Sequence, residues 1–259
     1  MNNYPIATIL GGGGFIGRYL VRNLTKKNFR CIVPTRNPFT KGYLKTQAPP
    51  GAIEIINFDP KNFNEIKNAI NNSDVVINLI GILNEKRKQK FSTIHTDLPE
   101  GIATLCSQTD VKKFIHVSAI GANKESRSKY QQSKFLGEEK ALNNFKNTLI
   151  IRPSVVCGSE DNFTNLFAKL SLSPIIPVVN KNYKLQPIFV NDVARAIVKA
   201  IEIKNNGGQI YEIGGEKIMS FEDLIKLILK IIGKKRLVVE MPMTLAKIQS
   251  ALLGLLPIP

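Results

Sequence analysis

Short apolar runs alternate with amphipathic helical patterns along the first 150 residues. The apolar runs, which predict strands, lie at residues 6–10, 30–33, 53–57, 75–80, 114–117 and 148–151. Between them, apolar positions recur at helical spacing at residues 15–25, 63–70, 98–107 and 128–142. Strands that alternate with helices predict an α/β fold, a doubly wound parallel sheet with helices on both faces.

The alternation becomes less regular beyond about residue 150, where prolines interrupt the pattern. We therefore expect residues 1–150 to form a dinucleotide-binding domain. Residues 151–259 would complete the sheet and add a smaller C-terminal lobe on the substrate side. Residues 37–51, with three prolines and two glycines, are expected to form a loop. The apolar stretch 245–259 either packs on its own domain or lies on a partner or membrane surface.

Charge and cysteine content narrow the class of protein. The chain has 36 Lys and Arg against 20 Asp and Glu, a net charge of +16. Such a balance suits an acidic partner or an anionic membrane, although a general enrichment in lysine explains it as well. Nucleic acid is not expected, because no reader motif accompanies the charge. The basic run at residues 85–90 predicts a solvated loop, with a docking patch as the alternative. Cys31, Cys106 and Cys157 lack metal-ligand spacing, so we expect buried free thiols, no metal and a cytoplasmic location.

The turn after the first predicted strand is dense in glycine. Gly11, Gly14 and Gly17 have the spacing GxxGxxG between a strand and a helix pattern. The first glycine permits a tight turn, the second lets backbone N–H groups approach a pyrophosphate, and the third allows close packing of helix on strand. The sequence therefore predicts a Rossmann-type dinucleotide cradle, which also includes Gly13, Phe15 and Ile16.

The end of the second predicted strand indicates which dinucleotide is bound. An acidic residue at this place accepts a hydrogen bond from the NAD ribose and repels a 2′-phosphate, but this chain has Arg36. A guanidinium suits bidentate phosphate binding, so we expect NADPH (NADP) to be preferred over NAD. The alternative is that Arg36 is a solvated loop residue. Arg18 is the expected second phosphate partner, and Lys41 or Lys45 could help from the following loop.

A second group of residues carries possible chemistry. Tyr130 and Lys134 are four apart on one helix face, and Ser118 follows the predicted strand 114–117. The ammonium of Lys134 could favour the phenolate of Tyr130 and bind a nicotinamide ribose. Ser118 would then orient a substrate oxygen. The alternative is that Tyr130 and Lys134 are ordinary surface residues.

These motifs resemble the extended or atypical branch of the short-chain dehydrogenase/reductase superfamily. The strings are LGGGGFIG at residues 10–17, YQQSK at 130–134, IRPSVVCG at 151–158 and FVNDVA at 189–194, so the resemblance covers nearly the whole chain. It implies that Asp59 contacts the adenine. It also implies that Leu79, Ile80 and Gly81, with Pro153, border the cofactor.

Four further strings are similar to the nucleotide-binding accessory subunit of respiratory complex I and its bacterial relatives. They are GFIGRYLV at residues 14–21, IVPTR at 32–36, DVVINLIG at 74–81 and KFIHVS at 113–118. This resemblance implies a structural or regulatory NADPH and a vestigial trio of Ser118, Tyr130 and Lys134. It also implies complex I partners on the cytoplasmic side near the membrane arm, at the inner face of the respiratory membrane.

Two functions of different class therefore stay open. One is a scaffold subunit of complex I, and the other is a free NADPH-dependent reductase or epimerase. His95 stands where extended enzymes carry a helix Asn, and this departure favours the scaffold. By its own pattern, His95 at a polar helix start predicts a surface residue, whereas His116 within an apolar strand predicts a hydrogen-bonded core histidine.

Overall fold

The computed structural model describes residues 4–86, 89–204 and 207–242. The predicted segment at 245–259 and part of the basic run at 85–90 lie outside the described residues. The chain divides into two compact units, which we consider separately. Unit 1 comprises Met1–Ser154 and Ile188–Ile213, and unit 2 comprises Val155–Pro187 and Gly214–Pro259.

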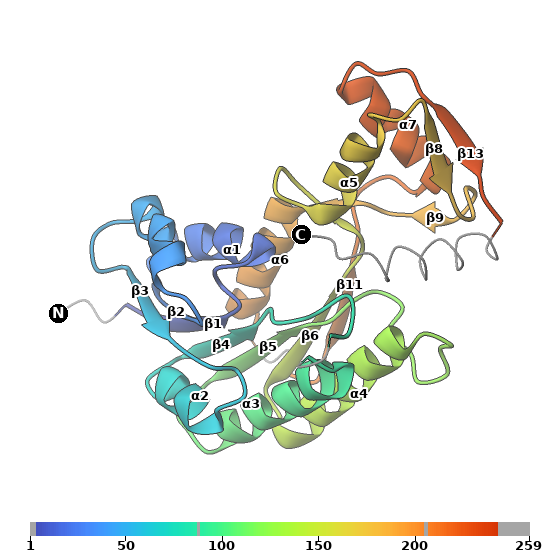
Figure 1. The fold of residues 1–259 in the computed structure, drawn as a ribbon. Coiled ribbons are helices and arrows are strands. Elements are labelled where there is room, and N and C mark those ends of the chain that lie inside the picture. The colour runs from blue at the N-terminus through green and yellow to red at the C-terminus, as the bar shows by residue number, and fades with distance from the viewer. Residues whose placement is uncertain (1–3, 87–88, 205–206, 243–259) are drawn as a thin grey trace. The chain divides into compact units, whose positions relative to one another are not determined.

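Unit 1 is built on a seven-stranded sheet in the order β11-β6-β5-β4-β1-β2-β3 (Figure 1). The strands are β1 Ile6–Leu10, β2 Arg30–Thr35, β3 Ile53–Asn57, β4 Val75–Asn78, β5 Lys113–Val117, β6 Thr148–Pro153 and β11 Ile210–Ile213. All neighbouring strands pair in parallel. The order reverses between β1 and β4, and in such sheets ligands bind outside the carboxyl ends of the strands at this point. The predicted doubly wound sheet is confirmed.

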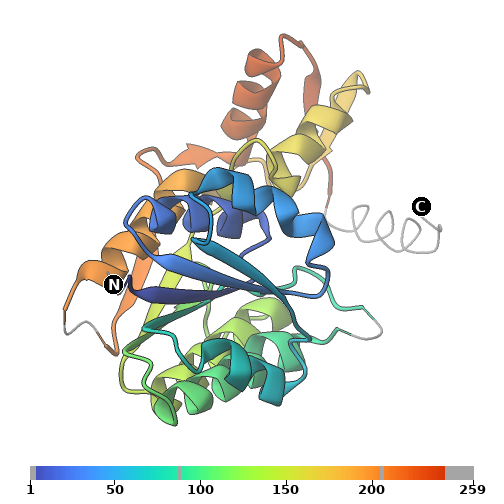
Figure 2. The same cartoon turned by 90° about the vertical axis from the view of Figure 1, so that its left-hand side faces the viewer.

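Helices cover both faces of this sheet (Figures 1 and 2). One face carries α1 Phe15–Thr25, the 3₁₀ helix η1 Phe39–Gln47 and α6 Val190–Glu202. The other face carries α2 Phe63–Ile70, the π-helical turn η2 Ser92–Asp97, α3 Leu98–Ser107 and α4 Lys129–Asn144. The core between sheet and helices includes the fully buried side chains of Phe114, Ile66 and Ile102. Replacement of Phe114 by alanine would cost about 3 to 5 kcal/mol.

The prediction of a loop at residues 37–51 is wrong for its central part. Residues 39–47 form η1, which packs near β3, and the Leu44 side chain is fully buried. The prolines that suggested a loop lie on either side of η1, at positions 38, 49 and 50, where they bound the helix without interrupting it. This helix matters for the site described below.

Unit 2 is a small α/β assembly with its own core. Its elements are β7 Val156–Cys157, α5 Asn162–Leu170, β8 Ile175–Val178, β9 Lys184–Leu185, β12 Met219–Ser220, α7 Phe221–Ile231 and β13 Leu237–Glu240, whereas the short strand β10 Ile188–Phe189 belongs to unit 1. Strand β13 pairs with β8 in parallel, and β12 pairs with β9 antiparallel. A capping box of Ser220 and Asp223 begins α7, and the side chains of Phe167, Ile176 and Ile225 fill the core.

The cysteines agree in part with expectation. Cys31 and Cys106 are buried free thiols, as predicted, but Cys157 is only half-buried. Burial raises the pKa of the Cys31 thiol to about 12, so it stays protonated and inert at neutral pH. None of the helices in the described parts of the chain has the length and apolar character needed to cross a membrane.

Candidate functional site

The glycine loop joins the buried strand β1 to helix α1. Gly11 has a φ of 84°, which other residues rarely adopt, and a Cβ there would lie 3.2 Å from the backbone nitrogen of Ile80. A Cβ on Gly17 would lie 2.5 Å from the carbonyl oxygen of Gly11, so only glycine fits. Helix α1 has no side-chain cap and no acidic residue in its first turn. The N–H groups in the first turn of α1 are therefore available to bind an anion at the N-terminus of the helix.

Helix η1 folds over this loop. A Cβ on Gly13 would lie 2.8 Å from Cδ of Lys41, so the lysine side chain rests on the loop. The Tyr43 hydroxyl donates a hydrogen bond to the Gly13 carbonyl oxygen at 3.3 Å. The Arg18 guanidinium carbon lies 5.3 Å from the centre of the Tyr43 ring, a cation–π contact. Two cations, Lys41 and Arg18, thus lie beside the glycine loop.

Tyr43 is a site residue that the sequence did not reveal, because nothing in the pattern of residues 37–51 indicated a helix. Arg36 is exposed and follows the last residue of β2, the strand beside β1. The structure therefore places Arg36 at the same sheet edge as the glycine loop. Lys45 is exposed on η1.

The segment after β4 borders the glycine loop from the other side. The Leu79 backbone N–H donates to the Leu10 carbonyl oxygen at 2.9 Å, and the Ile80 N–H donates to Oδ1 of Asn78 at 3.0 Å. Residues 79–81 thus lie at the carboxyl end of β1, beside Gly11. Asp59 lies beyond β3, the edge strand, where its carboxylate accepts the Lys61 N–H at 3.0 Å. Its contact with adenine stays a prediction from the resemblance.

Ser118 and Lys134 lie together at the carboxyl end of β5. The Lys134 ammonium donates to the carbonyl oxygen of Val117, the residue before Ser118, at 3.0 Å. Burial lowers the pKa of Lys134 to about 8, against the opposing effect of the Glu138 carboxylate. The Ser118 hydroxyl is buried and has no hydrogen-bonding partner among the described residues. A buried hydroxyl without a partner is costly, so this atom is poised for a ligand.

Tyr130 begins the same helix, one turn before Lys134, and is half-buried. Its ring meets the rings of Phe91 and His95 edge to face, at centroid distances of 5.8 and 5.3 Å. Burial raises the pKa of the Tyr130 hydroxyl. The phenol is therefore protonated at neutral pH in this structure.

The prediction that His95 is a surface residue is wrong. The side chain is 1% exposed and lies on the π-helical turn η2, stacked on Phe91 at 5.1 Å. Its Nε2 accepts the Ile82 backbone N–H at 3.1 Å, so the proton lies on Nδ1, which donates to the Ser133 hydroxyl at 2.9 Å. The physical reason for burial is that α4 comes very close, since a Cβ on Gly137 would collide with the His95 carbonyl oxygen.

This network connects two parts of the site. Ser133 in turn donates to the Tyr130 carbonyl oxygen at 2.7 Å, so His95 joins the segment after β4 to the helix that carries Tyr130. Burial and the nearby Lys134 charge lower the pKa of His95 to about 4. His95 is therefore neutral at physiological pH and holds its neighbours in place. Turns of π-helix are frequent at functional sites.

His116 is a hydrogen-bonded core histidine, as predicted. It is fully buried, and its Nδ1 accepts from the Asn78 side-chain amide at 3.2 Å, because the amide oxygen already serves Ile80. Burial lowers the pKa of His116 well below its usual value. It is neutral and takes no part in acid or base chemistry at neutral pH.

A buried ion pair supports helix α4 behind the site. Glu138, 1% exposed, accepts from Nε and Nη2 of Arg152 at 3.0 and 2.6 Å. Arg152 also binds Glu212 at 3.1 Å, which ties α4 to β6 and β11. Pro153 is buried at the end of β6, and its carbonyl oxygen accepts the Ile120 N–H at 3.1 Å.

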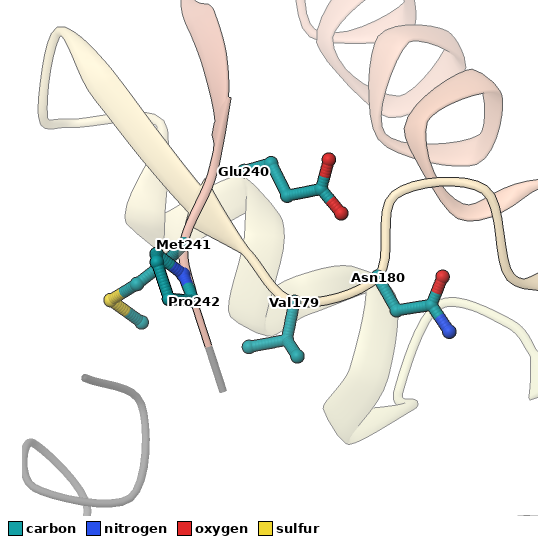
Figure 3. Close-up of a pocket in the computed structure, with 5 residues that line it drawn as sticks. All are labelled: Val179, Asn180, Glu240, Met241 and Pro242. Carbon is teal, nitrogen blue, oxygen red and sulfur yellow. The ribbon is translucent and has the colours of Figure 1, made fainter. Parts of the chain in front are cut away.

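A separate hollow of about 480 Å³ lies in unit 2, lined by Val179, Asn180, Glu240, Met241 and Pro242 (Figure 3). It is open, and none of the predicted site residues lines it. Among the residues that the structure describes, no group of acidic, histidine or cysteine side chains could hold a metal ion.

The residues of unit 1 fit a dinucleotide. The glycine loop leaves an uncapped helix end for a pyrophosphate, and the Lys134 ammonium and the Ser118 hydroxyl can bind a ribose and a substrate oxygen at the switch point of the sheet. In the chemistry of such sites, a bound nicotinamide supplies or accepts a hydride. The residues present would bind and orient it, with Tyr130, one turn before Lys134 on α4, as the candidate acid.

Comparison with known proteins agrees with this geometry. Two solved structures have a similar fold: an epimerase described as putative from Burkholderia cenocepacia (TM-score 0.77, 18% identity, 92% of this chain and 84% of that one) and the UDP-glucuronic acid 4-epimerase of Bacillus cereus in complex with NAD (TM-score 0.77, 23%, 91% and 87%). At these identities the likeness concerns the fold alone.

Curated relatives are more similar in sequence. The NADH dehydrogenase [ubiquinone] 1 alpha subcomplex subunit 9 of Dictyostelium discoideum is 33% identical over 227 residues, 86% of this chain and 63% of the relative. The mouse protein of that name is 33% identical (86% and 60%), and the NADH-ubiquinone oxidoreductase 40 kDa subunit of Neurospora crassa is 30% identical (93% and 64%). The chain thus spans less than two thirds of the length of these relatives.

The model of one protein family, described as the NAD dependent epimerase/dehydratase family, matches residues 7–214. This match runs from the first strand of the sheet to the end of its last strand, β11, and includes the glycine loop, Ser118, Tyr130 and Lys134. The chain belongs to the NAD dependent epimerase/dehydratase family.

Proposed function

We propose that this chain is a nucleotide-binding accessory subunit of respiratory complex I and that it holds NADP(H) as a structural cofactor. The observation that carries this proposal is the state of the site around α4. The glycine loop, Lys134 and the unpartnered Ser118 hydroxyl would hold a nucleotide, whereas His95, at the position where extended enzymes carry a helix Asn, is a neutral side chain with both ring nitrogens hydrogen-bonded. Relatives named as complex I subunits in an amoeba, a mammal and a fungus support the same assignment.

A bound nucleotide has a purpose without turnover. A ligand that binds only the folded state stabilises it by about 2.7 kcal/mol at a concentration one hundred times the Kd. It would fix the glycine loop, η1 and the segment after β4, which already contact one another at Gly11 and Gly13. These three segments would then present a fixed surface to neighbouring subunits.

The charge at the end of β2 supports NADP(H) over NAD(H). Arg36 stands where an acidic residue would bind the NAD ribose, and Arg18 and Lys41 add positive charge beside the loop. A 2′-phosphate there would be bound by guanidinium groups, which suit it better than an ammonium does. The 2′-hydroxyl of NAD would find no acidic partner at Arg36.

The test is a binding titration of NADPH and NADH against the full chain and two variants. Arg36→Asp is expected to weaken NADPH binding by about 100-fold, because it removes a charged contact of about 1.5 to 3 kcal/mol and adds a repulsive charge. Binding of NADH should weaken little. Lys67→Asp, at an exposed lysine of α2 on the other face of the sheet, is the matched control and should keep the wild-type selectivity. Equal selectivity of Arg36→Asp and wild type would show that Arg36 is not the phosphate partner.

A second function keeps one specific observation in its favour. The unpartnered Ser118 hydroxyl lies beside Lys134, and Tyr130 is on the same helix, which is the trio that a free reductase or epimerase would use. A protein named ceramide reductase from Caulobacter vibrioides is 27% identical over 198 residues, 74% of this chain and 60% of its own length. In such a reaction Tyr130 would give its hydroxyl proton to the substrate oxygen.

The two functions differ in what a substrate screen finds. Oxidation of NADPH by a carbonyl compound, abolished in Tyr130→Phe but retained in Tyr4→Phe, would establish the enzyme. The scaffold function predicts that NADPH binds with the same affinity to wild type and Tyr130→Phe and that neither oxidises it.

The proposed location is the cytoplasmic side of complex I near the membrane arm, at the inner face of the respiratory membrane, in peripheral contact with anionic lipid.

A further inference from the structure

One end of unit 2 brings together two connections that are far apart in the sequence. Helices α5 and α7 pack together and end where the paired parallel strands β8 and β13 begin (Figure 1). The Leu237 N–H donates to the Pro174 carbonyl oxygen at 3.1 Å, and Nε of Arg236 donates to the Ser171 carbonyl oxygen at 2.7 Å. We call this end, residues 169–175 and 230–237, the tip.

The tip exposes large aliphatic side chains. Leu172 is 77% exposed, Ile231 is 74% exposed and Leu237 is 63% exposed. Ile175 lies opposite Leu237 in the register of the two strands and is also exposed. The next residues, Ile176 and Val238, face the core of unit 2, so Ile175 and Leu237 are on the outer side of the sheet, whereas Leu172 follows α5 and Ile231 ends α7. These side chains contribute little to the fold of unit 2 in the described residues.

The same surface is strongly basic. Its cations are Lys169, Lys230, Lys234, Lys235 and Arg236, and neither stretch of the tip contains an acidic residue. The acidic side chains of α7 and β13, namely Glu222, Asp223 and Glu240, lie at the opposite ends of their elements. The tip therefore presents positive charge and aliphatic side chains together.

Helix stability explains only part of this arrangement. Lysines in the last turns of α5 and α7 complement the negative ends of the helix dipoles, which accounts for Lys169 and Lys230. The interaction with the helix dipoles explains neither the presence of Lys234 and Lys235 nor the exposed aliphatic side chains. Protein interfaces are enriched in aromatic residues and depleted in lysine, whereas the tip has four lysines and no aromatic residue. Lysine beside protruding aliphatic side chains is the composition that suits an anionic bilayer.

We propose that the tip is a membrane-docking surface that binds an anionic lipid bilayer, its lysines at the headgroups and Leu172, Ile231 and Leu237 inserted among them. This inference rests on the proposed function and deepens its peripheral contact with anionic lipid by naming the surface that makes it. Its assay needs neither nucleotide nor complex I, so that failure of one proposal is distinguishable from failure of the other.

The test is sedimentation of the full chain with sucrose-loaded vesicles of phosphatidylcholine alone or of equal parts phosphatidylcholine and phosphatidylglycerol. Wild type should sediment only with the anionic vesicles. The pair Lys234→Gln and Lys235→Gln should bind about 30-fold more weakly, since each lysine near the surface contributes about a factor of five. The matched control is Lys67→Gln with Lys124→Gln, two exposed lysines of unit 1 with the same change of charge. It should bind within a fewfold of wild type.

A second pair separates insertion from charge alone. The double variant Leu172→Ser with Ile231→Ser has the same net charge as wild type and keeps every core side chain, so it should fold. Its binding to anionic vesicles should nevertheless be about tenfold weaker or more. Three results would overturn the inference: no binding of wild type to anionic vesicles, equal binding of the tip variants and the control pair, or retention of vesicle binding by the tip variants with loss of binding to an acidic protein.

Discussion

The buried histidine of the site makes the stability of this protein depend on pH in a defined window. The pKa of His95 is about 4 in the folded protein, against 6.5 for an unperturbed histidine, because the side chain is buried near Lys134. Between these two values the unfolded chain binds the proton and the folded chain does not. Acidification through this window therefore favours unfolding, and the stability contributed by a neutral His95 is fully present only above about pH 6.5.

The magnitude follows from the two pKa values. From about pH 7 to about pH 5, linkage gives a loss of about 2 kcal/mol from His95 alone. His116 acts in the same direction, since its pKa is also lowered by burial. These are the two histidines of the chain, so the contribution of each can be removed separately.

The assay is urea unfolding followed by circular dichroism at both pH values, for wild type, His95→Gln and His116→Gln. A glutamine can still accept from the Ile82 N–H and donate to Ser133, and it does not titrate. We expect the stability of His95→Gln to fall by about 2 kcal/mol less than that of wild type on acidification. Equal losses in wild type and His95→Gln would refute the burial and the bonding assigned to His95.

Three further predictions concern the surroundings of the site. Gly137→Ala should lower the free energy of unfolding by about 1 to 3 kcal/mol in thermal melts through overpacking, whereas Gly42→Ala, which has no neighbour within 4 Å of its Cβ, should not; a neutral Gly137→Ala would contradict the close contact of α4. Glu138→Gln should destabilise by about 3 kcal/mol in urea titrations, because it leaves a guanidinium without its buried partner; a loss within about 0.5 kcal/mol would mean that the pair is dispensable. Cys31 and Cys106, whose thiol pKa values burial raises, should react with a thiol reagent at neutral pH only after denaturation, so rapid labelling of the native protein would contradict their burial.

The sequence predicted the sheet and its helices because their periodic patterns are local. The bounds of β1, β3, α1, α2 and α3 agree with expectation, since each apolar run is limited by glycine, proline or polar residues. Helix η1 was missed because it is short and is held by tertiary contacts of Leu44 and Tyr43 that no spacing reveals.

The site was predictable by its motifs but not by its environment. The order of the glycine loop, Ser118, Tyr130 and Lys134 indicated the family, which the comparison establishes. The burial of His95 depends on the close approach of α4 at Gly137, and the raised pKa of Tyr130 depends on rings from another element. Such features arise from packing between segments that are distant in the sequence.

The most direct test of the central claim is the migration of the native chain on a native gel of detergent-solubilised membranes, with the nucleotide content of each band measured after extraction. The account predicts that the chain migrates with complex I, that this band contains NADP(H), and that the nucleotide is lost from the complex in an Arg36→Asp strain. Migration of the chain as a small free species, with NADPH oxidised on addition of a carbonyl substrate, would contradict the account and establish the enzyme instead.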